Sequence, residues 1–125
     1  MARSVTLTRR ELDIMSVLWK LGHATVGEIR DNLSDDLAYP TVQTMLRVLE
    51  AKKFVKHRLE GRAFRFYPLI GPDDAGDGAL ERLVSKVYQG SRELLISRLI
   101  ADQDVSADEL RRMKKILQQR IDQAM

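Results

Sequence analysis

The sequence of 125 residues contains no cysteine, which excludes disulfide bonds, thiol catalysis and metal sites built from thiolates. No apolar run approaches the roughly 20 residues that a membrane-spanning helix needs. The first residues, MARSVTLTRRELD, lack the hydrophobic core of an export signal. We therefore expect a cytoplasmic protein that does not insert into a membrane.

Motifs of the common enzyme classes are missing as well. The sequence has no G-x-S-x-G nucleophile motif, no H-E-x-x-H zinc motif and no glycine-rich phosphate loop. Its two histidines, His23 and His57, do not have metal-ligand spacing. We expect no catalytic site, no metal site and no cofactor.

Positive charge is concentrated in one part of the chain. Residues 1–70 contain 12 Lys and Arg and 8 Asp and Glu, whereas residues 71–125 contain 9 and 10. Seven basic and two acidic residues fall within residues 47–65. Such a local excess favours a polyanionic partner, with a solvated charged surface as the alternative.

Three short helices are predicted in the first half. The first two begin with capping boxes, Thr8 with Glu11 and Thr25 with Glu28. Gly22 is expected to end the first helix, and Pro40 suits the first turn of the third. Each helix has apolar residues at helical spacing, so each should bury one side, and Trp19 is expected to pack in the core.

The third helix, within residues 38–55, combines an apolar stripe with a polar outer side. Val42, Met45, Leu46 and Leu49 are spaced for burial. Hydroxyl, amide and guanidinium groups, which can read base edges or hold phosphates, occupy the other side. These outer residues are Thr41, Gln43, Thr44 and Arg47.

A basic β-hairpin is predicted next. FVKHRL and AFRFYP alternate apolar with basic side chains, and Gly61 suits the short loop between them. The basic residues, expected near phosphates, are Lys56, Arg58, Arg62 and Arg65. His57 falls on the apolar side and should pack rather than bind a ligand. Three helices and a hairpin describe a winged helix-turn-helix, whose third helix would enter the major groove.

The second half of the chain is predicted to form a helical module. GPDDAGDG, residues 71–78, indicates a linker or loose turn, and Ser106 with Glu109 forms a third capping box. A module this small builds a poor core alone, so a second copy should cover its apolar stripes, with packing onto the chain's own first half as the alternative. The expected dimerisation residues are Leu95, Leu99, Leu110 and Leu117.

The expected fold class is therefore mainly α with a small β-hairpin wing. A winged helix-turn-helix DNA-binding domain would cover residues 1–70, a linker residues 71–78, and a helical dimerisation domain residues 79–125. A winged-helix protein-interaction or adaptor module is one alternative function, but it leaves Arg47 and the basic hairpin unexplained. A small-ligand-responsive regulator is another, and it would need a pocket.

Several segments together resemble the penicillinase-repressor family, also called BlaI/MecI/CopY. They are LTRRELDIMSVLWKLGHATVGEIRDNL, TVQTMLRVLEAKKFV and EGRAFRFYPLI, with weaker similarity through VYQGSRELLISRLIADQDVSADELRRMKKIL. The resemblance implies a homodimeric winged-helix repressor on double-stranded DNA, at dyad operators that commonly contain TACA/TGTA half-sites. It also implies that its recognition-helix contacts fall on Thr41, Gln43, Thr44 and Arg47.

The family resemblance also bears on regulation. It implies that cleavage of the C-terminal module, by a membrane metallopeptidase sensor system or another protease, relieves repression. Three features depart from the family pattern. Lys53 replaces the glycine after the recognition helix, so we expect the helix to end by another capping motif. The cysteine cluster of the copper-responsive branch is absent. Arg98–Leu99 stands where penicillinase repressors have the cleaved Asn-Phe bond.

Overall fold

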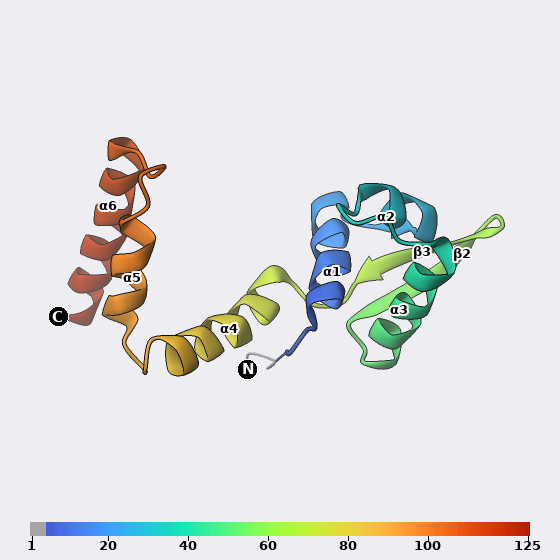
Figure 1. Cartoon of the computed structure of the whole chain (residues 1–125), viewed down its shortest axis with the longest axis horizontal. Coiled ribbons are helices and arrows are strands. Elements are labelled where there is room, and N and C mark those ends of the chain that lie inside the picture. The colour runs from blue at the N-terminus through green and yellow to red at the C-terminus, as the bar shows by residue number, and fades with distance from the viewer. Residues whose placement is uncertain (1–4) are drawn as a thin grey trace. The chain divides into compact units, whose positions relative to one another are not determined.

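The computed structural model describes residues 5–125, and the chain divides into two compact units, Met1–Leu80 and Glu81–Met125. The first unit contains α1 (Arg9–Leu21), β1 (Ala24–Thr25), α2 (Val26–Asn32), α3 (Tyr39–Ala51), β2 (Val55–Glu60) and β3 (Ala63–Pro68) (Figure 1). After α4 (Pro72–Arg82), the second contains α5 (Arg92–Ile100) and α6 (Ala107–Ala124). The expected mainly helical fold with a small hairpin wing is confirmed. Within residues 5–125, every helix is too short or too polar to cross a membrane.

The predicted starts of α1 and α2 are confirmed in detail. Thr8 accepts a hydrogen bond from the Glu11 N–H, and the Glu11 carboxylate accepts from the Thr8 N–H at 2.8 Å. Thr25 and Glu28 repeat this exchange at the start of α2. Gly22 ends α1 with a φ of 86°, in the left-handed region where a side chain is unfavourable. Local hydrogen bonding therefore determines where the first two helices begin.

The end of α3 corrects one expectation. Lys53 takes the left-handed conformation itself, with φ 66°, at the position where the family resemblance implies glycine. Its N–H donates to the Glu50 carbonyl at 2.9 Å, and the Phe54 N–H donates to the Leu49 carbonyl at 3.0 Å. This pair of bonds is a Schellman motif, so the helix ends by the usual device with an unfavourable residue in it. The buried side chains of Leu49 and Phe54 hold the motif in place.

The three strands form one antiparallel sheet in the order β1-β3-β2. Two residues, Gly61 and Arg62, join β2 to β3, and Gly61 has a φ of 62°. The register sets His57 opposite Phe66 and Leu59 opposite Phe64. The two-residue strand β1, which was not predicted, pairs Thr25 with Arg65 and so attaches the hairpin to the start of α2.

The hydrophobic core of the first unit is built by α1, α2, α3 and the base of the sheet. Its largest fully buried side chains include Ile14, Met15, Leu18, Ile29, Leu46 and Leu49. Trp19 packs against this core, as expected, and its indole N–H donates to the Ile70 carbonyl at 2.8 Å. These contacts bring the three helices and the hairpin into one unit.

Among residues 5–80, Glu11 is the buried charged residue, with 5% of its surface exposed. Lys52, at the end of α3, donates to Glu11 at 2.7 Å. Burial by itself raises the pKa of Glu11, but the hydrogen bond from Lys52 and those from Thr8 outweigh it and lower the pKa. The paired carboxylate thus links the start of α1 to the end of α3.

The expectation that residues 71–78 form a linker or loose turn is wrong, because helix α4 begins at Pro72. Pro72 occupies the first helical position, and the Gly71 N–H donates to the Asp74 carboxylate at 2.8 Å. Asp73 and Asp74 also suit the positive end of the helix dipole, and Ala75 is buried. These starting interactions outweigh the weak helix propensity of Gly76 and Gly78.

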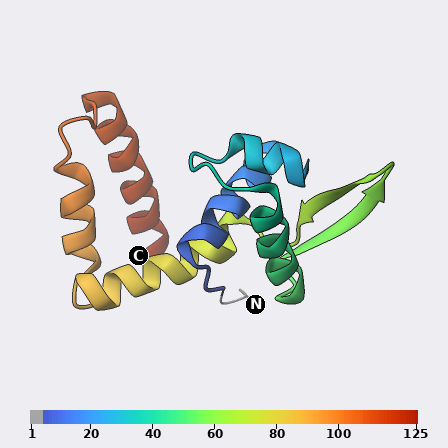
Figure 2. The same cartoon turned by 45° about the vertical axis from the view of Figure 1, so that its right-hand side comes forward.

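The second unit consists of a π-helical turn over Leu83–Val87, followed by α5 and α6, which run side by side in opposite directions (Figures 1 and 2). Ser91 and Ser106 accept hydrogen bonds from the backbone of Leu94 and Glu109 and cap the two helices. All residues from 81 to 125 are described, and none of them is buried. In a single copy, this unit has no core.

Candidate nucleic-acid interface

The expected recognition residues lie together on the outer side of α3. Thr41, Thr44 and Arg47 are exposed, and Gln43 is half-buried beside the hairpin. The Thr44 hydroxyl donates to the Pro40 carbonyl at 3.0 Å, which leaves its oxygen able to accept a further hydrogen bond. The inward side of the helix, with Val42, Leu46 and Leu49, is fully buried in the core and fixes this orientation.

The hairpin has two chemically different sides. Lys56 and Arg58 share one side with Tyr67, and their charged groups lie 5.9 and 5.6 Å from the centre of its ring. Leu59 and Phe64 form a cross-strand pair on the other side and are 66% and 40% exposed. Arg62, in the two-residue loop at the tip, is also exposed. One side of the hairpin therefore offers basic contacts, and the opposite side offers apolar contacts.

Arg65 does not join the other basic residues as an available contact. Its guanidinium donates to Glu60 at 2.8 Å and lies 3.3 Å from the carboxylate of Glu28, and only 18% of its side chain is exposed. The hydrogen bond to Glu60 raises the pKa of Arg65, so the guanidinium remains charged. Arg65 thus holds the hairpin against the start of α2, an assignment that the spacing of basic residues did not reveal.

Glu28 has two roles at this junction. Hydrogen bonds with the Thr25 side chain and backbone lower the pKa of Glu28, and the nearby Arg65 acts in the same direction. The His23 ring nitrogen lies 3.0 Å from Arg65 as well. The cap of α2 and the base of the hairpin are therefore joined by one polar cluster, which orients the wing.

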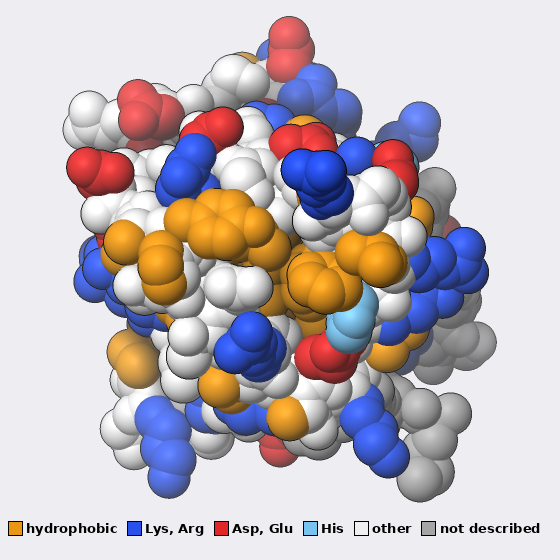
Figure 3. Space-filling view, turned by 90° about the vertical axis from the view of Figure 1, so that its right-hand side faces the viewer, with side chains coloured by type: hydrophobic (Ala, Val, Ile, Leu, Met, Phe, Trp, Pro, Cys, Tyr) orange, Lys and Arg blue, Asp and Glu red, His pale blue; other side chains and the backbone are white. Residues whose placement is uncertain are grey.

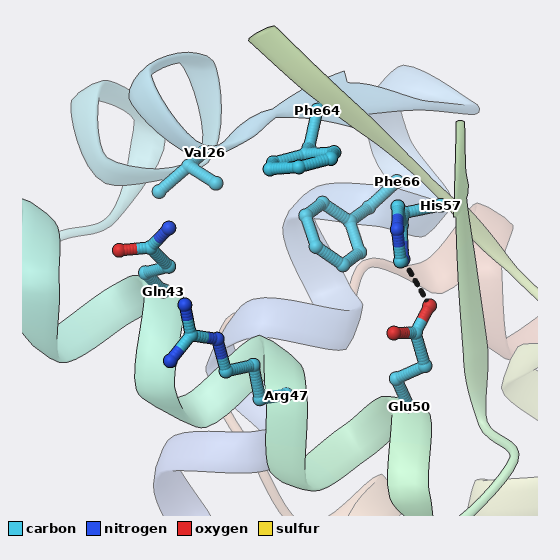
Figure 4. Close-up of a pocket in the computed structure, with 7 residues that line it drawn as sticks. All are labelled: Val26, Gln43, Arg47, Glu50, His57, Phe64 and Phe66. Atoms are coloured by element: carbon cyan, nitrogen blue, oxygen red, sulfur yellow. Dashed lines mark hydrogen bonds and ion pairs between the residues drawn. The ribbon is translucent and has the colours of Figure 1, made fainter. Parts of the chain in front are cut away.

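A cavity of about 150 Å³ lies between α3 and the hairpin (Figure 4). Gln43 and Arg47 extend into it from α3, while the rings of Phe64 and Phe66 lie on the side of the hairpin. The remaining lining residues are Val26, Glu50 and His57. Glu50 and His57 form an ion pair that connects α3 to β2. The cavity thus combines hydrogen-bond donors on one wall with aromatic rings on the other.

Sequence patterns did not single out Glu50, Phe64 and Phe66 as site residues. His57 packs as expected, with its ring centre 5.0 Å from that of Phe64, but its ion pair with Glu50 was not expected. The only hint in the sequence is that Glu50 follows Arg47 by three residues, which puts both on neighbouring parts of α3. Which residue faces Glu50 depends on the hairpin register and could not be inferred.

The surface that contains α3 and the hairpin combines apolar and charged side chains. Apolar side chains form a band across the face, with Lys and Arg side chains on both sides of it (Figure 3). A histidine lies next to an acidic side chain at the edge of the band (Figure 3). The face is therefore neither a uniform positive surface nor an apolar patch.

The four leucines expected at a dimer interface all lie in the second unit. Leu99, Leu110 and Leu117 are 57%, 37% and 48% exposed, and Leu95 is half-buried. Leu95 and Leu99 follow each other by one turn of α5, and Leu110 and Leu117 by two turns of α6. Each helix thus presents an uncovered apolar stripe.

Comparisons with known proteins find chains that are similar in sequence and in the fold of the first unit. The chain is 31% identical over 121 residues to the transcriptional regulator BlaI of Mycobacterium tuberculosis, covering 94% of this chain and 86% of that protein. It is 22% identical over 117 residues to the methicillin resistance regulatory protein MecI of Staphylococcus aureus, covering 92% and 95%. The solved DNA-binding domain of the repressor BlaI matches with 33% identity and a TM-score of 0.51, covering 59% of this chain and 93% of that domain.

A model of the penicillinase repressor family matches residues 7–119, which is most of the chain. The named relatives are regulators and repressors of transcription, in agreement with the expectation that the chain is not an enzyme. Family model, relatives and fold all lead to the same conclusion. The chain belongs to the penicillinase repressor family.

Proposed function

We propose that this chain is a sequence-specific DNA-binding repressor of transcription that works in the cytoplasm as a homodimer on a dyad operator. The observation that carries the proposal is the polar outer side of α3 next to a hairpin with exposed basic residues. Membership of a repressor family and the likeness to a solved DNA-binding domain support the same function.

Each exposed group has a role that its chemistry suits. An α-helix about 10–12 Å wide fits the major groove, so α3 can bring Arg47 and Gln43 to base edges. Arg47 would pair with guanine and Gln43 with adenine, while the hydroxyls of Thr41 and Thr44 hold phosphates. Lys56, Arg58 and Arg62 would contact phosphates from the hairpin and make affinity depend on salt. Arg65 is left out because two carboxylates already hold it.

The homodimer is supported by the uncovered stripes of the second unit. Exposed apolar side chains on α5 and α6 have no core to enter within residues 81–125. A second copy would bury these stripes, and burial contributes about 25 cal/mol for each Å² removed from water. Two equivalent subunits related by a two-fold axis would match a dyad operator, with one α3 in each half-site.

Proteolysis of the second unit is the proposed route of induction. Arg98–Leu99 is exposed and lies in a nine-residue helix without a buried side chain, so local opening costs little free energy. A protease, such as a membrane metallopeptidase sensor system, could then cut this segment without touching α3. Loss of the dimer would release the operator, because a single winged helix reads too few base pairs to bind tightly.

Selection from random duplex DNA tests the proposal directly. We expect the full-length chain to enrich a dyad with two equal half-sites, of the TACA/TGTA type that the family resemblance implies. A Lys56→Ala chain should select the same sequence with lower affinity, because phosphate contacts carry no base information. Absence of any enriched sequence at low salt would contradict DNA reading and favour a protein-interaction module.

A further inference from the structure

An ion pair lies in the cavity between α3 and the hairpin, within the surface to which we assign DNA binding. Glu50, in the last turn of α3, pairs with Nδ1 of His57 on β2 (Figure 4). The side chains of His57 and Glu50 are 39% and 35% exposed, so the pair remains accessible from solvent. It joins the two elements that would enter neighbouring grooves.

The position of Glu50 would be unfavourable for DNA binding if its carboxylate were free to approach a phosphate. The carboxylate lines the same cavity as Arg47 and Gln43, which can also donate to phosphate. A carboxylate beside a phosphate is a like-charge contact, and such contacts weaken association. Nδ1 of His57 is the partner that the structure gives this carboxylate.

The geometry of a duplex indicates what the cavity would hold. With α3 in the major groove and the hairpin at the neighbouring minor groove, the strand that separates the two grooves passes between them. Arg47 has five N–H donors and the Gln43 amide has two, so each can hold a base edge and still donate one hydrogen bond to its phosphate. Phe64 and Phe66 offer ring surface to its deoxyribose. Donors on one wall and rings on the other match the two chemical parts of a sugar–phosphate backbone.

Resting on the function proposed above, we propose that this cavity holds the backbone of one DNA strand and that His57 is a positioning residue that engages the Glu50 carboxylate there. The contact at Nδ1 keeps the carboxylate on β2 and away from the phosphate, and it holds the hairpin beside α3. The rings of Phe64 and Phe66 from β3 pack against His57, while Lys56 and Arg58 of its own strand lie on the opposite side of the sheet.

A double-mutant cycle in the full-length chain separates the contact between His57 and Glu50 from simple packing. Affinities are measured for one selected duplex at fixed salt with His57→Gln, Glu50→Gln and the double variant. We expect His57→Gln to weaken binding at least about tenfold, because it removes the Nδ1 contact and leaves the Glu50 carboxylate free beside the phosphate. Glu50→Gln should change affinity by less than about threefold, and adding it to His57→Gln should restore most of the loss.

Two controls make the cycle specific. Arg111→Ala likewise leaves a carboxylate, that of Asp108, without its partner, but in α6, and it should not change DNA affinity. Thermal unfolding of each variant shows whether the first unit keeps its fold. A loss in Glu50→Gln equal to that in His57→Gln, a loss that the double variant does not restore, or no loss in His57→Gln would each overturn the inference.

A wild-type chain that binds no duplex would overturn the proposed function and this inference together, whereas the results above overturn the role of the pair alone.

Discussion

Hydroxyl side chains cap two helices in residues 5–80, with Thr8 and Thr25, and two in residues 81–125, with Ser91 and Ser106. The two regions nevertheless differ in where their apolar side chains lie. In the first unit the stripes of α1, α2 and α3 meet in a core with fully buried Ile, Leu, Met and Val. In the second unit the stripes of α5 and α6 stay on the surface. Local capping therefore determines where a helix lies, but burial needs elements that converge from several directions.

This difference separates two kinds of stability. The first unit has the contacts to fold as a single copy, because its core includes residues from three helices and three strands. The second has helices whose apolar sides need another surface. We therefore expect changes in the first unit to act on unfolding and DNA contacts, and changes in the second to act on association.

Removing the second unit should have the largest effect on DNA affinity. A chain truncated after Leu80 should stay folded and sediment as a monomer, because the core lies within residues 5–75. Its affinity for a dyad site should fall by about 10²–10⁴-fold, since the second half-site contact is no longer intramolecular. Sedimentation and titration onto the dyad check this prediction. Full affinity in a monomeric fragment would show that the second unit is not needed for tight binding.

Matched leucine substitutions should distinguish burial in the two units. Leu46→Ala removes a fully buried side chain from α3 and should lower the free energy of unfolding by about 2–5 kcal/mol. Leu117→Ala, at a position 48% exposed in one copy, should instead raise the dimer dissociation constant. Urea unfolding and sedimentation equilibrium measure the two quantities. Equal loss of unfolding free energy at concentrations where both chains are monomeric would show that the second unit has a core of its own.

Arg47→Ala should weaken specific DNA binding by about 1–3 kcal/mol if the side chain contacts a base edge. Sedimentation should not change, because Arg47 lies on α3, outside the second unit. The matched control, Lys115→Ala in α6, removes the same charge and should leave the specificity unchanged. An equal loss on selected and random duplexes would make Arg47 a phosphate contact instead.

Lys53→Gly should stabilise the first unit by about 0.5–1 kcal/mol, because the left-handed conformation at φ 66° favours glycine. Lys53→Ala keeps the unfavourable conformation while removing the side chain, so it separates strain from lost contacts. Denaturant unfolding gives both values, and dimerisation should be the same in all three chains. Destabilisation by glycine would mean that the lysine side chain contributes more than the strain.

The smallest expected effect is on the stability of the first unit at acidic pH. Although burial raises the pKa of Glu11, hydrogen bonds from Lys52 and Thr8 lower it below its ordinary value near 4.5. The unfolded chain therefore takes up the proton first, so this stabilisation is complete above pH 4.5 and is lost as the pH falls through the lower, folded pKa. Unfolding of the truncated chain between pH 6 and pH 3 should show less acid destabilisation in Glu11→Gln than in wild type. An identical pH dependence would remove Glu11 from this role.

Short-range signals in the sequence predicted much of the fold. The two Thr–Glu capping boxes, Gly22, Pro40 and the loop at Gly61 all lie where expected, because each acts within about four residues. Glycine, proline and aspartate in residues 71–78 misled the prediction, since the same residues that form turns can also start a helix. The outer side of α3 followed from helical spacing, while its use in DNA binding stays a prediction.

Contacts between residues that are far apart in the sequence could not be predicted. Arg65 and Glu28 are far apart in sequence, and their pairing depends on β1, a strand of two residues without a periodic pattern. The Glu50–His57 pair likewise depends on how the hairpin meets α3. At Lys53, packing of the neighbouring residues imposes a left-handed backbone conformation that a lysine disfavours, so the sequence at this position did not predict the structure. Spacing reveals which side of an element is polar but not which partner it meets.

The order of the sheet also bears on aggregation. β2 is an outer strand, so one row of its backbone N–H and C=O groups can pair with a strand of another chain. Its six residues include Lys56, Arg58 and Glu60 at alternate positions, and charged side chains on a short strand discourage such pairing. The wing therefore resists edge-to-edge assembly, which leaves the apolar stripes of residues 81–125 as the surface for the proposed homodimer.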